Sequence, residues 1–387
     1  MENNKNPNIR FKGFTDPWEQ RKFGDVGSVS MCKRIFKNET SDGGDIPFYK
    51  IGTFGGEPDA FISRELFEEY KKKFSYPNEG DILLSASGTI GRIVEYTGED
   101  AYFQDSNIVW LSHDKSICNK FLKVLYPTVK WDGIEGSTIK RLYNDNFLKT
   151  QFMMPKIEEQ ERLGEYFEQL DHLITLHQRK YNKLLNVKKS MLEKMFPKNG
   201  SNIPEIRFKG FTDPWEQRKV SEVSEIVAGG TPSTSVSEYW EPKEVPWLSS
   251  GEVHKKYITY TDDMISKNGL ANSSAKMIKK NSVLIALAGQ GKTRGTVAIN
   301  RISLSTNQSI AAMSFNDDIV PEFVFSNLEN RYDEIRAMSS GDGSRGGLNK
   351  QLVGDIIIPY TIKEEQQKIG QYFSNLDHLI TLHQREF

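Results

Sequence analysis

The chain has 387 residues, a formal net charge of −1 and the composition of an ordinary globular protein, with 37% hydrophobic and 27% charged residues. This length is enough for two domains with separate cores. Its apolar runs are short and its N-terminus is polar, so we expect no membrane span and no signal peptide. Cys32 and Cys118 form no CxxC pair, which favours a reducing, cytoplasmic location and argues against a disulfide scaffold or a cysteine-built zinc site.

A fourteen-residue motif, IRFKGFTDPWEQRK, occurs twice in the chain. It occupies residues 9–22 and, letter for letter, residues 206–219. Its aspartate, proline and glutamate have the spacing of a capped helical turn. We expect Trp18 and Trp215 to anchor this turn against a domain; stacking on a ligand is the alternative.

Both halves of the chain contain apolar, β-rich runs that end in glycine. Residues 82–88 correspond to residues 283–289, and both runs are typical of buried strands that lead into loops. Charged stretches with a helical pattern, at 65–73 and 320–336, alternate with such runs. Each half is therefore predicted to be a mixed α/β unit.

Residues 157–196 carry the longest helical pattern in the chain, with one glycine and no proline. Mostly apolar residues recur along it at intervals of three and four: Leu163, Phe167, Leu170, Ile174, His177, Tyr181, Leu184, Lys188, Met191 and Met195. Such a stripe must pack along another helix. A straight helix of this length would measure about 60 Å, which is too long for one core. We interpret it as a spacer between two bodies.

A shorter copy of this helix ends the sequence. The residues LDHLITLHQR occur at 170–179 and again at 376–385, whereas residues 182–196 have no second copy. The copied stripe comprises Ile369, Phe373, Leu376, Ile380 and His383. A duplication on this scale predicts two similar units related by a pseudo-symmetry axis. The two helices would bury each other's stripes if they packed antiparallel.

Charge is unevenly distributed along the second half. Residues 264–316 contain no Asp or Glu and seven basic residues. A solvated lysine face does not explain the missing acids, whereas a surface that faces a polyanion does.

Two motifs resemble enzyme signatures without matching their structural context. Residues 286–293, ALAGQGKT, are one glycine short of a phosphate loop, but a strand-like RGTVAI follows them instead of a helix, so a DNA backbone suits them better than ATP. Asp59, Glu69 and Lys71 have the spacing of a metal-dependent nuclease, which would need the two acids on adjacent strands around Mg²⁺. The pattern around Glu69 is instead that of an exposed helix.

The histidine pairs His172/His177 and His378/His383 are the same pair in both copies. At a spacing of five, two side chains lie about 140° apart on a helix, so one helix cannot hold a metal ion with both. His177 and His383 fall on the stripe, where a polar layer that fixes helix register is expected. A zinc site shared by two helices is the alternative.

Together these motifs resemble the specificity subunit of a type I restriction–modification system. The resemblance rests on the paired RF-G-F…W-E motifs, the lead-ins at 155–160 and 359–366, and the repeated LDHLITLHQR. Residues 229–234, GGTPST, and 246–251, PWLSSG, are similar to the start of many target-recognition domains. The resemblance covers nearly the whole chain. One departure is the short distal helix, from which a weaker contact with modification subunits is expected.

The resemblance implies a mixed α/β (α+β) fold of two pseudo-symmetric globular target-recognition domains separated by two long antiparallel coiled-coil helices. The expected boundaries are 1–155 for the first domain, 156–197 for the central spacer helix, 198–360 for the second domain and 361–387 for the short distal spacer helix.

The resemblance also implies a DNA-reading subunit that is not itself an enzyme. Each domain would read one half of a bipartite, asymmetric site in double-stranded DNA. The helices would set the unread spacing and dock two modification (adenine methyltransferase) subunits and the restriction (ATP-dependent translocase and nuclease) subunits. S-adenosylmethionine, ATP and Mg²⁺ would belong to those partners, with no cofactor in this chain. The nuclease described above and a non-DNA coiled-coil scaffold are the alternative hypotheses.

Phosphate contacts supply affinity for DNA, and contacts to base edges supply specificity. Amides pair with adenine and arginine with guanine, which guides the choice of base-reading candidates. The phosphate candidates of the second domain are Lys276, Lys279, Lys280, Lys292, Thr293, Arg294 and Arg301. Its base candidates are Gln290, Asn307, Gln308, Ser344, Arg345 and Asn349. The aligned candidates of the first domain are Ser85, Ser87, Thr89, Arg92, Gln104, Asn107, Thr138, Lys140 and Arg141.

Overall fold

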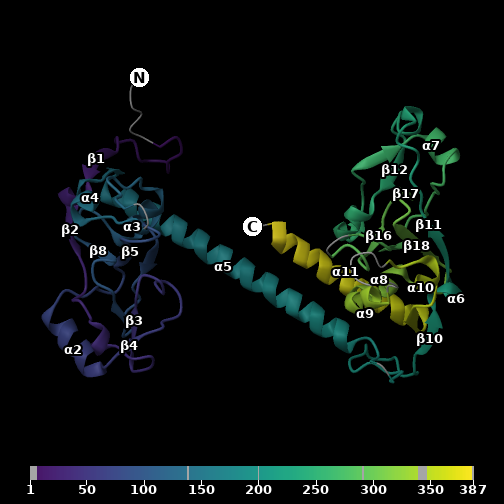
Figure 1. The fold of residues 1–387 in the computed structure, drawn as a ribbon, viewed down its shortest axis with the longest axis horizontal. Coiled ribbons are helices and arrows are strands. Elements are labelled where there is room, and N and C mark those ends of the chain that lie inside the picture. Colours follow the sequence, from purple (N-terminus) through teal and green to yellow (C-terminus); the bar gives the residue numbers. More distant parts are fainter. Residues whose placement is uncertain (1–6, 137–138, 199, 290–291, 339–346, 386–387) are drawn as a thin grey trace. The chain divides into compact units, whose positions relative to one another are not determined.

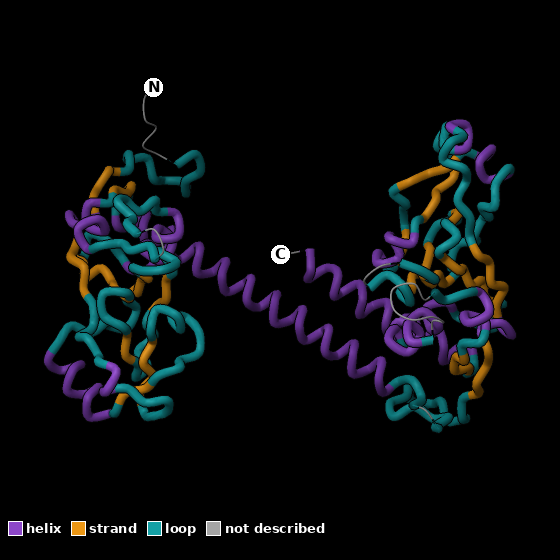
Figure 2. The backbone as a smooth tube through the Cα atoms, viewed as in Figure 1, coloured by secondary structure: helices purple, strands orange, loops and turns teal. Residues whose placement is uncertain are grey.

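The computed structural model (Figure 1) describes the chain at residues 7–136, 139–198, 200–289, 292–338 and 347–385. The chain divides into two compact units, residues 1–175 and 176–387. Both contain interleaved helices and strands (Figure 2), which confirms the mixed α/β prediction. No helix in the described ranges is long and apolar enough to cross a membrane.

The first unit is built on two small sheets and a strand pair. Its four-stranded antiparallel sheet has the order β2 (Gly27–Ser30), β8 (Ile108–His113), β5 (Ile82–Ser85) and β6 (Ile93–Glu95). Its three-stranded sheet has the order β4 (Phe61–Ile62), β3 (Ile46–Tyr49) and β7 (Tyr102–Phe103). β1 (Glu19–Lys22) pairs antiparallel with β9 (Gln151–Met154), so the first and last strands of the unit lie together.

Short helices cover these sheets and lead to the long one. The helices of the first unit are α1 (Phe23–Val26), the 3-10 turn η1 (Lys37–Glu39), α2 (Arg64–Lys73), α3 (Asn119–Leu125), the 3-10 turn η2 (Tyr126–Thr128), α4 (Asn144–Lys149) and the first half of α5 (Ile157–Lys194). Phe23 is fully buried at the centre of the core, with the rings of Trp131, Phe147 and Phe152 between 4.5 and 5.4 Å from its own. This aromatic cluster joins α1, α4 and β9 into one body.

The second unit repeats this plan with a larger main sheet. Its five-stranded sheet has the order β11 (Ser224–Ala228), β18 (Ile310–Phe315), β15 (Val283–Ala286), β16 (Val297–Asn300) and β13 (Tyr257–Ile258). Its three-stranded sheet has the order β14 (Asp263–Ile265), β12 (Val245–Leu248) and β17 (Ser305–Thr306), and β10 (Glu216–Lys219) pairs with β19 (Ile357–Tyr360). Its helices are α6 (Val220–Val223), α7 (Lys267–Ala271), α8 (Pro321–Asn330), α9 (Tyr332–Ala337), α10 (Lys350–Gly354) and α11 (Lys363–Arg385).

The strands β5 and β15, which the apolar runs predicted, are buried at every residue. The helical turn predicted within the repeated DPWE segment is wrong. Glu19 begins strand β1 and Glu216 begins strand β10. The extended conformation prevails because each strand gains a ladder of main-chain hydrogen bonds from a partner more than a hundred residues away, β9 or β19. The two tryptophans do anchor the segment, and Trp215 is 1% exposed.

The second half of α5 lies in the second unit and runs antiparallel to α11. His177 meets His383 near the end of α11, whereas Lys188 meets Asp377 and Phe196 stacks on Phe373 nearer its start. The predicted antiparallel arrangement of the two helices is therefore confirmed. The distal stripe is buried throughout: Ile369, Phe373, Leu376, Ile380 and His383.

Candidate nucleic-acid interface

Most candidates of the first unit gather where β5 turns into β6. Gly88 N donates to the carbonyl of Lys140 at 2.9 Å, and Ser87 forms an isolated bridge with Arg141. These contacts place the segment 139–142 beside the turn, although more than fifty residues separate the two in sequence. Thr138 lies outside the described residues.

Several of these side chains hold the turn together. Ser85 Oγ donates to the carbonyl of Thr89 at 2.5 Å and accepts from Arg92 N at 2.9 Å. Ser87 Oγ donates to Asn107 Oδ1 at 2.7 Å. Ser85 and Ser87 are buried, so they shape the loop from inside.

The remaining candidates of the first unit differ in their contacts and exposure. Arg92 donates to the carbonyl of Phe54 at 2.7 Å, and Gln104 accepts from the main chain of Ile51 at 2.9 Å, so both bind within the unit. Thr89, Lys140 and Arg141 are exposed and form the part of the predicted set that faces solvent.

Sequence reasoning missed two exposed neighbours of this group. Ile139 is 62% exposed and Tyr143 is 49% exposed, and they flank Lys140 and Arg141. The letters IKRLY at 139–143 interleave basic residues with an aromatic one. Basic residues next to an exposed aromatic one suit contact with a polyanion, and this pattern could have been found from sequence.

The candidates of the second unit separate into two groups at opposite ends of β15. At its carboxyl end, Leu287 N donates to the carbonyl of Ser309 at 2.8 Å, and Leu348 N donates to the carbonyl of Leu287 at 2.9 Å. These bonds bring the residues that follow β15 next to the segments that contain Asn307, Gln308 and Asn349. Lys292, Thr293 and Arg294 belong to the same loop, between β15 and β16. Gln290, Ser344 and Arg345 lie outside the described residues.

In this group the side-chain amide oxygens already accept hydrogen bonds from within the protein. Asn349 Oδ1 accepts from Leu352 N at 2.9 Å and so caps α10, and Asn307 Oδ1 accepts from Ser309 N at 3.1 Å. Gln308 is exposed and accepts from Thr231 Oγ1 at 2.5 Å. Lys292 is exposed as well. This end is the counterpart of the exposed group in the first unit, because β15 occupies the place of β5.

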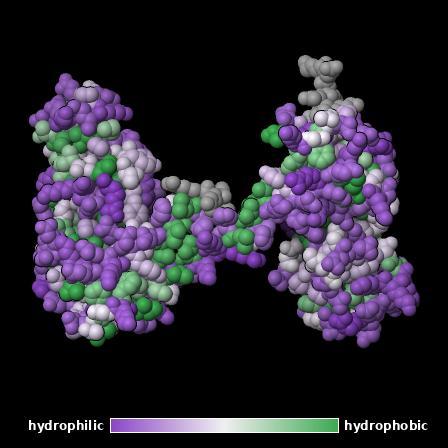
Figure 3. Space-filling model, turned by 180° about the vertical axis from the view of Figure 1, so that it is seen from behind, coloured by the Kyte–Doolittle hydropathy of each residue, from purple (hydrophilic) through white to green (hydrophobic). Residues whose placement is uncertain are grey.

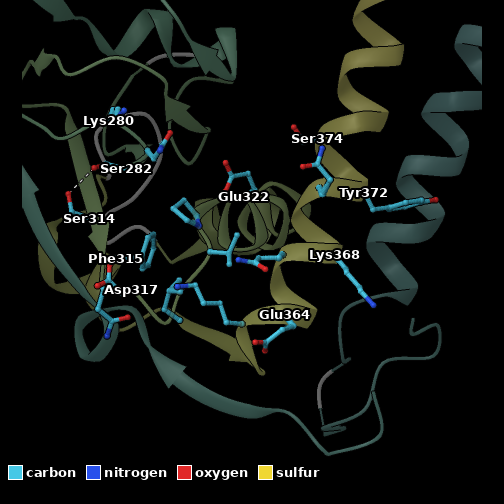
Figure 4. A pocket seen from close by; sticks show the side chains of 18 of the residues that line it. Lys280, Ser282, Ser314, Phe315, Asp317, Glu322, Glu364, Lys368, Tyr372 and Ser374 are labelled. Carbon is cyan, nitrogen blue, oxygen red and sulfur yellow. Dashed lines mark hydrogen bonds between the residues drawn. The ribbon is translucent and has the colours of Figure 1, made fainter. Parts of the chain in front are cut away.

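The other group, Lys279, Lys280 and Arg301, lies at the opposite end of β15. Arg301 donates to Glu322 at 2.7 Å. All three line a cavity of about 1250 Å³ (Figure 4), which also contains a face of α11 with Lys368 and Tyr372. The other side chains in Figure 4 include the acids Asp317, Glu322 and Glu364. A cavity that carries both signs of charge suits DNA phosphates less well than the exposed loops at the other end. Lys276 is exposed on the segment before β15.

A repeated ion-pair clamp joins each unit to its long helix. Arg10 donates twice to the Glu159 carboxylate, at 2.9 and 2.6 Å, and Trp18 Nε1 donates to the same group at 3.2 Å. Hydrogen bonding to Glu159 raises the pKa of Arg10 above its ordinary value. The same contacts recur in the second unit, at 2.6, 2.8 and 3.0 Å, among Arg207, Trp215 and Glu365. The repeated motifs, which end in β1 and β10, therefore hold the start of each long helix in place.

The next residue of each helix forms a second clamp. Gln160 accepts from Cys118 N at 3.1 Å and donates to the carbonyls of Ser116 and Pro155 at 3.0 and 2.9 Å. Its counterpart forms the same three bonds: Gln366 accepts from Val320 N and donates to the carbonyls of Asp318 and Thr361. The lead-in to each helix thus binds the start of α3 or α8 directly.

The nuclease geometry is absent from the described chain. Glu69 and Lys71 lie on α2, not on a strand, and Glu69 pairs with Lys73 at 2.8 Å. Asp59 pairs with Lys50 at 2.8 Å. The described residues contain no group of three or more His, Cys, Asp or Glu that could hold a metal ion. The near phosphate loop joins two antiparallel strands, β15 and β16, as its sequence predicted, and does not open a helix.

Two similar units, each clamped to a long helix and each exposing loops at the end of an equivalent central strand, define a duplicated two-unit protein. Residues 15–186 and 212–386 each match the type I restriction modification DNA specificity domain. The chain belongs to this family.

Relatives agree with this assignment. A putative type I restriction enzyme specificity subunit of Haemophilus influenzae is 58% identical over 156 residues, which is 39% of this chain and 40% of that protein. The chain thus spans well under half of that relative. A putative specificity subunit of Methanocaldococcus jannaschii is 24% identical over 395 residues, which is 96% of this chain and 89% of the relative. The crystal structure of a type I S subunit from M. genitalium has the same fold, with a TM-score of 0.55 at 15% identity over 97% of this chain and 93% of that one.

Proposed function

We propose that this chain is the DNA-specificity subunit of a type I restriction–modification complex and that each unit reads one half of a bipartite, asymmetric site. The observation that carries the proposal is the duplicated geometry. Equivalent strands, β5 and β15, end in exposed loops, and each unit is clamped to a long helix by the same residues. Two similar readers with different loops suit a site whose halves differ.

In the first unit we assign DNA contact to the exposed group around Lys140. Lys140 and Arg141 supply positive charge for phosphates, and Thr89 and Tyr143 supply hydroxyl groups that can donate to phosphates. In the second unit the corresponding contact comes from the loop of Lys292 and its neighbours. It lies within the acid-free stretch 264–316, where few carboxylates would repel DNA.

We place the chemistry in partner subunits. The proposed partners are two modification subunits with S-adenosylmethionine and restriction subunits with ATP and Mg²⁺, all acting on DNA in the cytoplasm. This chain would bind and position the DNA without a cofactor of its own. The long helices would set the unread spacing, because the clamps fix each unit to the start of a helix.

Methylome sequencing of cells that carry the complete system tests the proposal. We expect a methylated motif of two short halves separated by unread bases. Exchange of residues 23–150 for the corresponding segment of another specificity subunit should change one half and leave the other unchanged. A continuous methylated motif, or an exchange that alters both halves, would contradict the two-reader proposal.

A further inference from the structure

An arginine outside the predicted set lies at the end of the first unit's main sheet to which we assign DNA contact. The strands β2, β8 and β5 lie side by side and antiparallel in this sheet (Figure 1). Arg34 follows β2 and Asp105 precedes β8, so both belong to the same end of the sheet as the loop after β5. Met31 and Ser106, from the same two segments, line a cavity of about 550 Å³ together with Arg141.

Arg34 forms an ion pair that occupies one nitrogen of its guanidinium group. Its Nε donates to Asp105 Oδ2 at 2.8 Å. Nε carries one of the five N–H donors of arginine, and the two terminal nitrogens carry the other four. Among the residues that the structure describes, none accepts a hydrogen bond from these terminal nitrogens, and the Arg34 side chain is 60% exposed. The ion pair therefore leaves the terminal fork of Arg34 open to solvent.

The carboxylate partner is itself held in place. The Asp105 side chain is 16% exposed. On one side of it Gln104 Oε1 accepts from a main-chain amide at 2.9 Å, and on the other Asn107 Oδ1 accepts from Ser87 Oγ at 2.7 Å. Ser106 has a φ of 54°, a left-handed conformation that is uncommon outside glycine and that the surrounding structure must enforce. Asp105 is thus a rigid support that can fix the orientation of an arginine.

The second unit brings the same two segments together with different side chains. Its strands β11 and β18 take the places of β2 and β8 beside the central strand. Thr231 follows β11, Gln308 precedes β18, and Thr231 Oγ1 donates to Gln308 Oε1 at 2.5 Å. A charged pair in one unit and a neutral pair in the other, at corresponding places, is what two readers of different sequences require.

The surface also carries ordinary exposed ion pairs, and the Arg34 pair differs from them. The face of the chain in Figure 3 is largely hydrophilic, and exposed ion pairs on such a surface contribute little to stability. Arg64 and Asp100 form a pair of this kind at 3.0 Å, in which a terminal arginine nitrogen is the donor and the acid is 46% exposed. Asp100 precedes strand β7, whereas Asp105 follows it. Only the second of these pairs lies at the end of the sheet to which we assign DNA contact.

We propose that Arg34 is a specificity-determining residue that reads a guanine in the major groove, and that Asp105 is the residue that positions it. This inference rests on the proposed function and names one base of the first unit's half-site. The two terminal nitrogens of a fixed arginine match the O6 and N7 acceptors of guanine, the base that presents two acceptors at its major-groove edge. A phosphate also accepts from an arginine fork, and the experiment below separates the two.

Methylome sequencing of cells that carry the complete system with Arg34→Ala tests the inference. The exchange of residues 23–150 described above identifies the half-site of the first unit. We expect one G·C pair of that half to become degenerate, while the remaining positions and the other half stay unchanged. In competition binding by the assembled complex, discrimination at that pair should fall roughly tenfold or more.

Two further variants sharpen the test. Asp105→Ala should relax the same G·C pair, and the double variant should be no worse than Arg34→Ala, because both changes remove one interaction. Arg64→Ala is the matched control, because it removes an exposed arginine from an ion pair at the other end of β7, and it should leave the motif unchanged.

An unchanged motif with Arg34→Ala overturns the inference, and so does degeneracy at an A·T pair or in the other half-site. Methylation that weakens uniformly with the motif preserved would assign Arg34 to a phosphate, contrary to the inference. Relaxation of a different position by Asp105→Ala would refute its positioning role. If methylation is too weak to define a motif, competition binding with duplexes substituted at each G·C pair of that half decides. A bipartite wild-type motif that Arg34→Ala leaves unchanged refutes this inference alone, whereas a continuous wild-type motif refutes the proposed function.

Discussion

Lys188 is expected to be among the most important charged residues for the stability of the second unit. Its ammonium is buried with Asp377 and Glu329 at 2.5 and 2.6 Å, and Tyr257 donates to the other oxygen of Asp377 at 3.0 Å. Lys188→Met keeps the length of the side chain and removes its charge. The change leaves Asp377 without its ion-pair partner, whereas Glu329 keeps Lys256.

Loss of one member of a buried ion pair costs about 3–5 kcal/mol. Because Glu329 keeps a second lysine, we expect the lower end of this range, about 3 kcal/mol. For a unit of this size, that corresponds to a fall in Tm of roughly 6–12 °C. Calorimetry of the full chain measures the effect, and the second unit's transition should move while the first unit's does not.

The destabilisation caused by Lys188→Met should depend on pH because of the Glu329 carboxylate. Burial alone would raise its pKa, but attraction to Lys188 and Lys256 outweighs burial and lowers the pKa below its ordinary value. A carboxylate with a lowered pKa stabilises the folded state above its unfolded pKa and loses that contribution as pH falls through its folded pKa. The destabilisation by Lys188→Met should therefore be full at neutral pH and shrink in acid below about pH 4.

Lys189→Met is the matched control, because Lys189 is the exposed neighbour on the same helix. Its effect should stay within about 0.5 kcal/mol. Equal Tm values for the two variants, or a Lys188→Met effect that does not change with pH, would refute this reasoning.

Three further predictions follow from the same structure. Gly370→Ala should destabilise the second unit by about 1–3 kcal/mol in chemical denaturation, because a Cβ would collide with α8. A Cβ at Gly251 would make only an ordinary contact with Ser249 Oγ at 3.8 Å, so Gly251→Ala should be neutral. Lys140→Ala should reduce the salt slope of DNA binding by the assembled complex by about one, with exposed Lys72→Ala as control. Insertion of four residues after Leu173, where α5 is exposed, should lengthen the helix by about 6 Å and the unread spacing by one or two base pairs in methylome sequencing. An altered half-site would count against that last prediction.

The sequence predicted what depends on local periodicity and on the repeats. The apolar runs predicted β5 and β15, and the four-and-three pattern over residues 157–196 predicted α5, which spans Ile157–Lys194. The predicted turn at DPWE failed because the pairing that makes Glu19 extended comes from β9, far along the chain. Local capping signals do not contain that information.

The DNA candidates show a different limit. Ser85 and Lys279 were both chosen as polar or basic residues near a central strand, but Ser85 is buried and Lys279 lies at the end opposite the exposed loops. A single sequence does not tell which end of a strand faces a ligand. Lys188 was identified only as part of a mostly apolar stripe, since its partner Asp377 lies 189 residues away.

The clamps tie the two ends of each globular part of this chain together. Arg10 precedes strand β1 and Glu159 follows strand β9, and these two strands pair, so the chain enters and leaves the sheets of the first unit at the same place. The loops to which we assign DNA contact lie between these closed ends, so their sequence can change without a change in the contacts that hold the helix. The residues that close each unit belong to the repeated motifs, whereas the loops of the two units differ. Under the proposed function, specificity and spacing would therefore be carried by separate parts of the chain: the loops after β5 and β15 would select bases, and the clamped helices would set the distance between them.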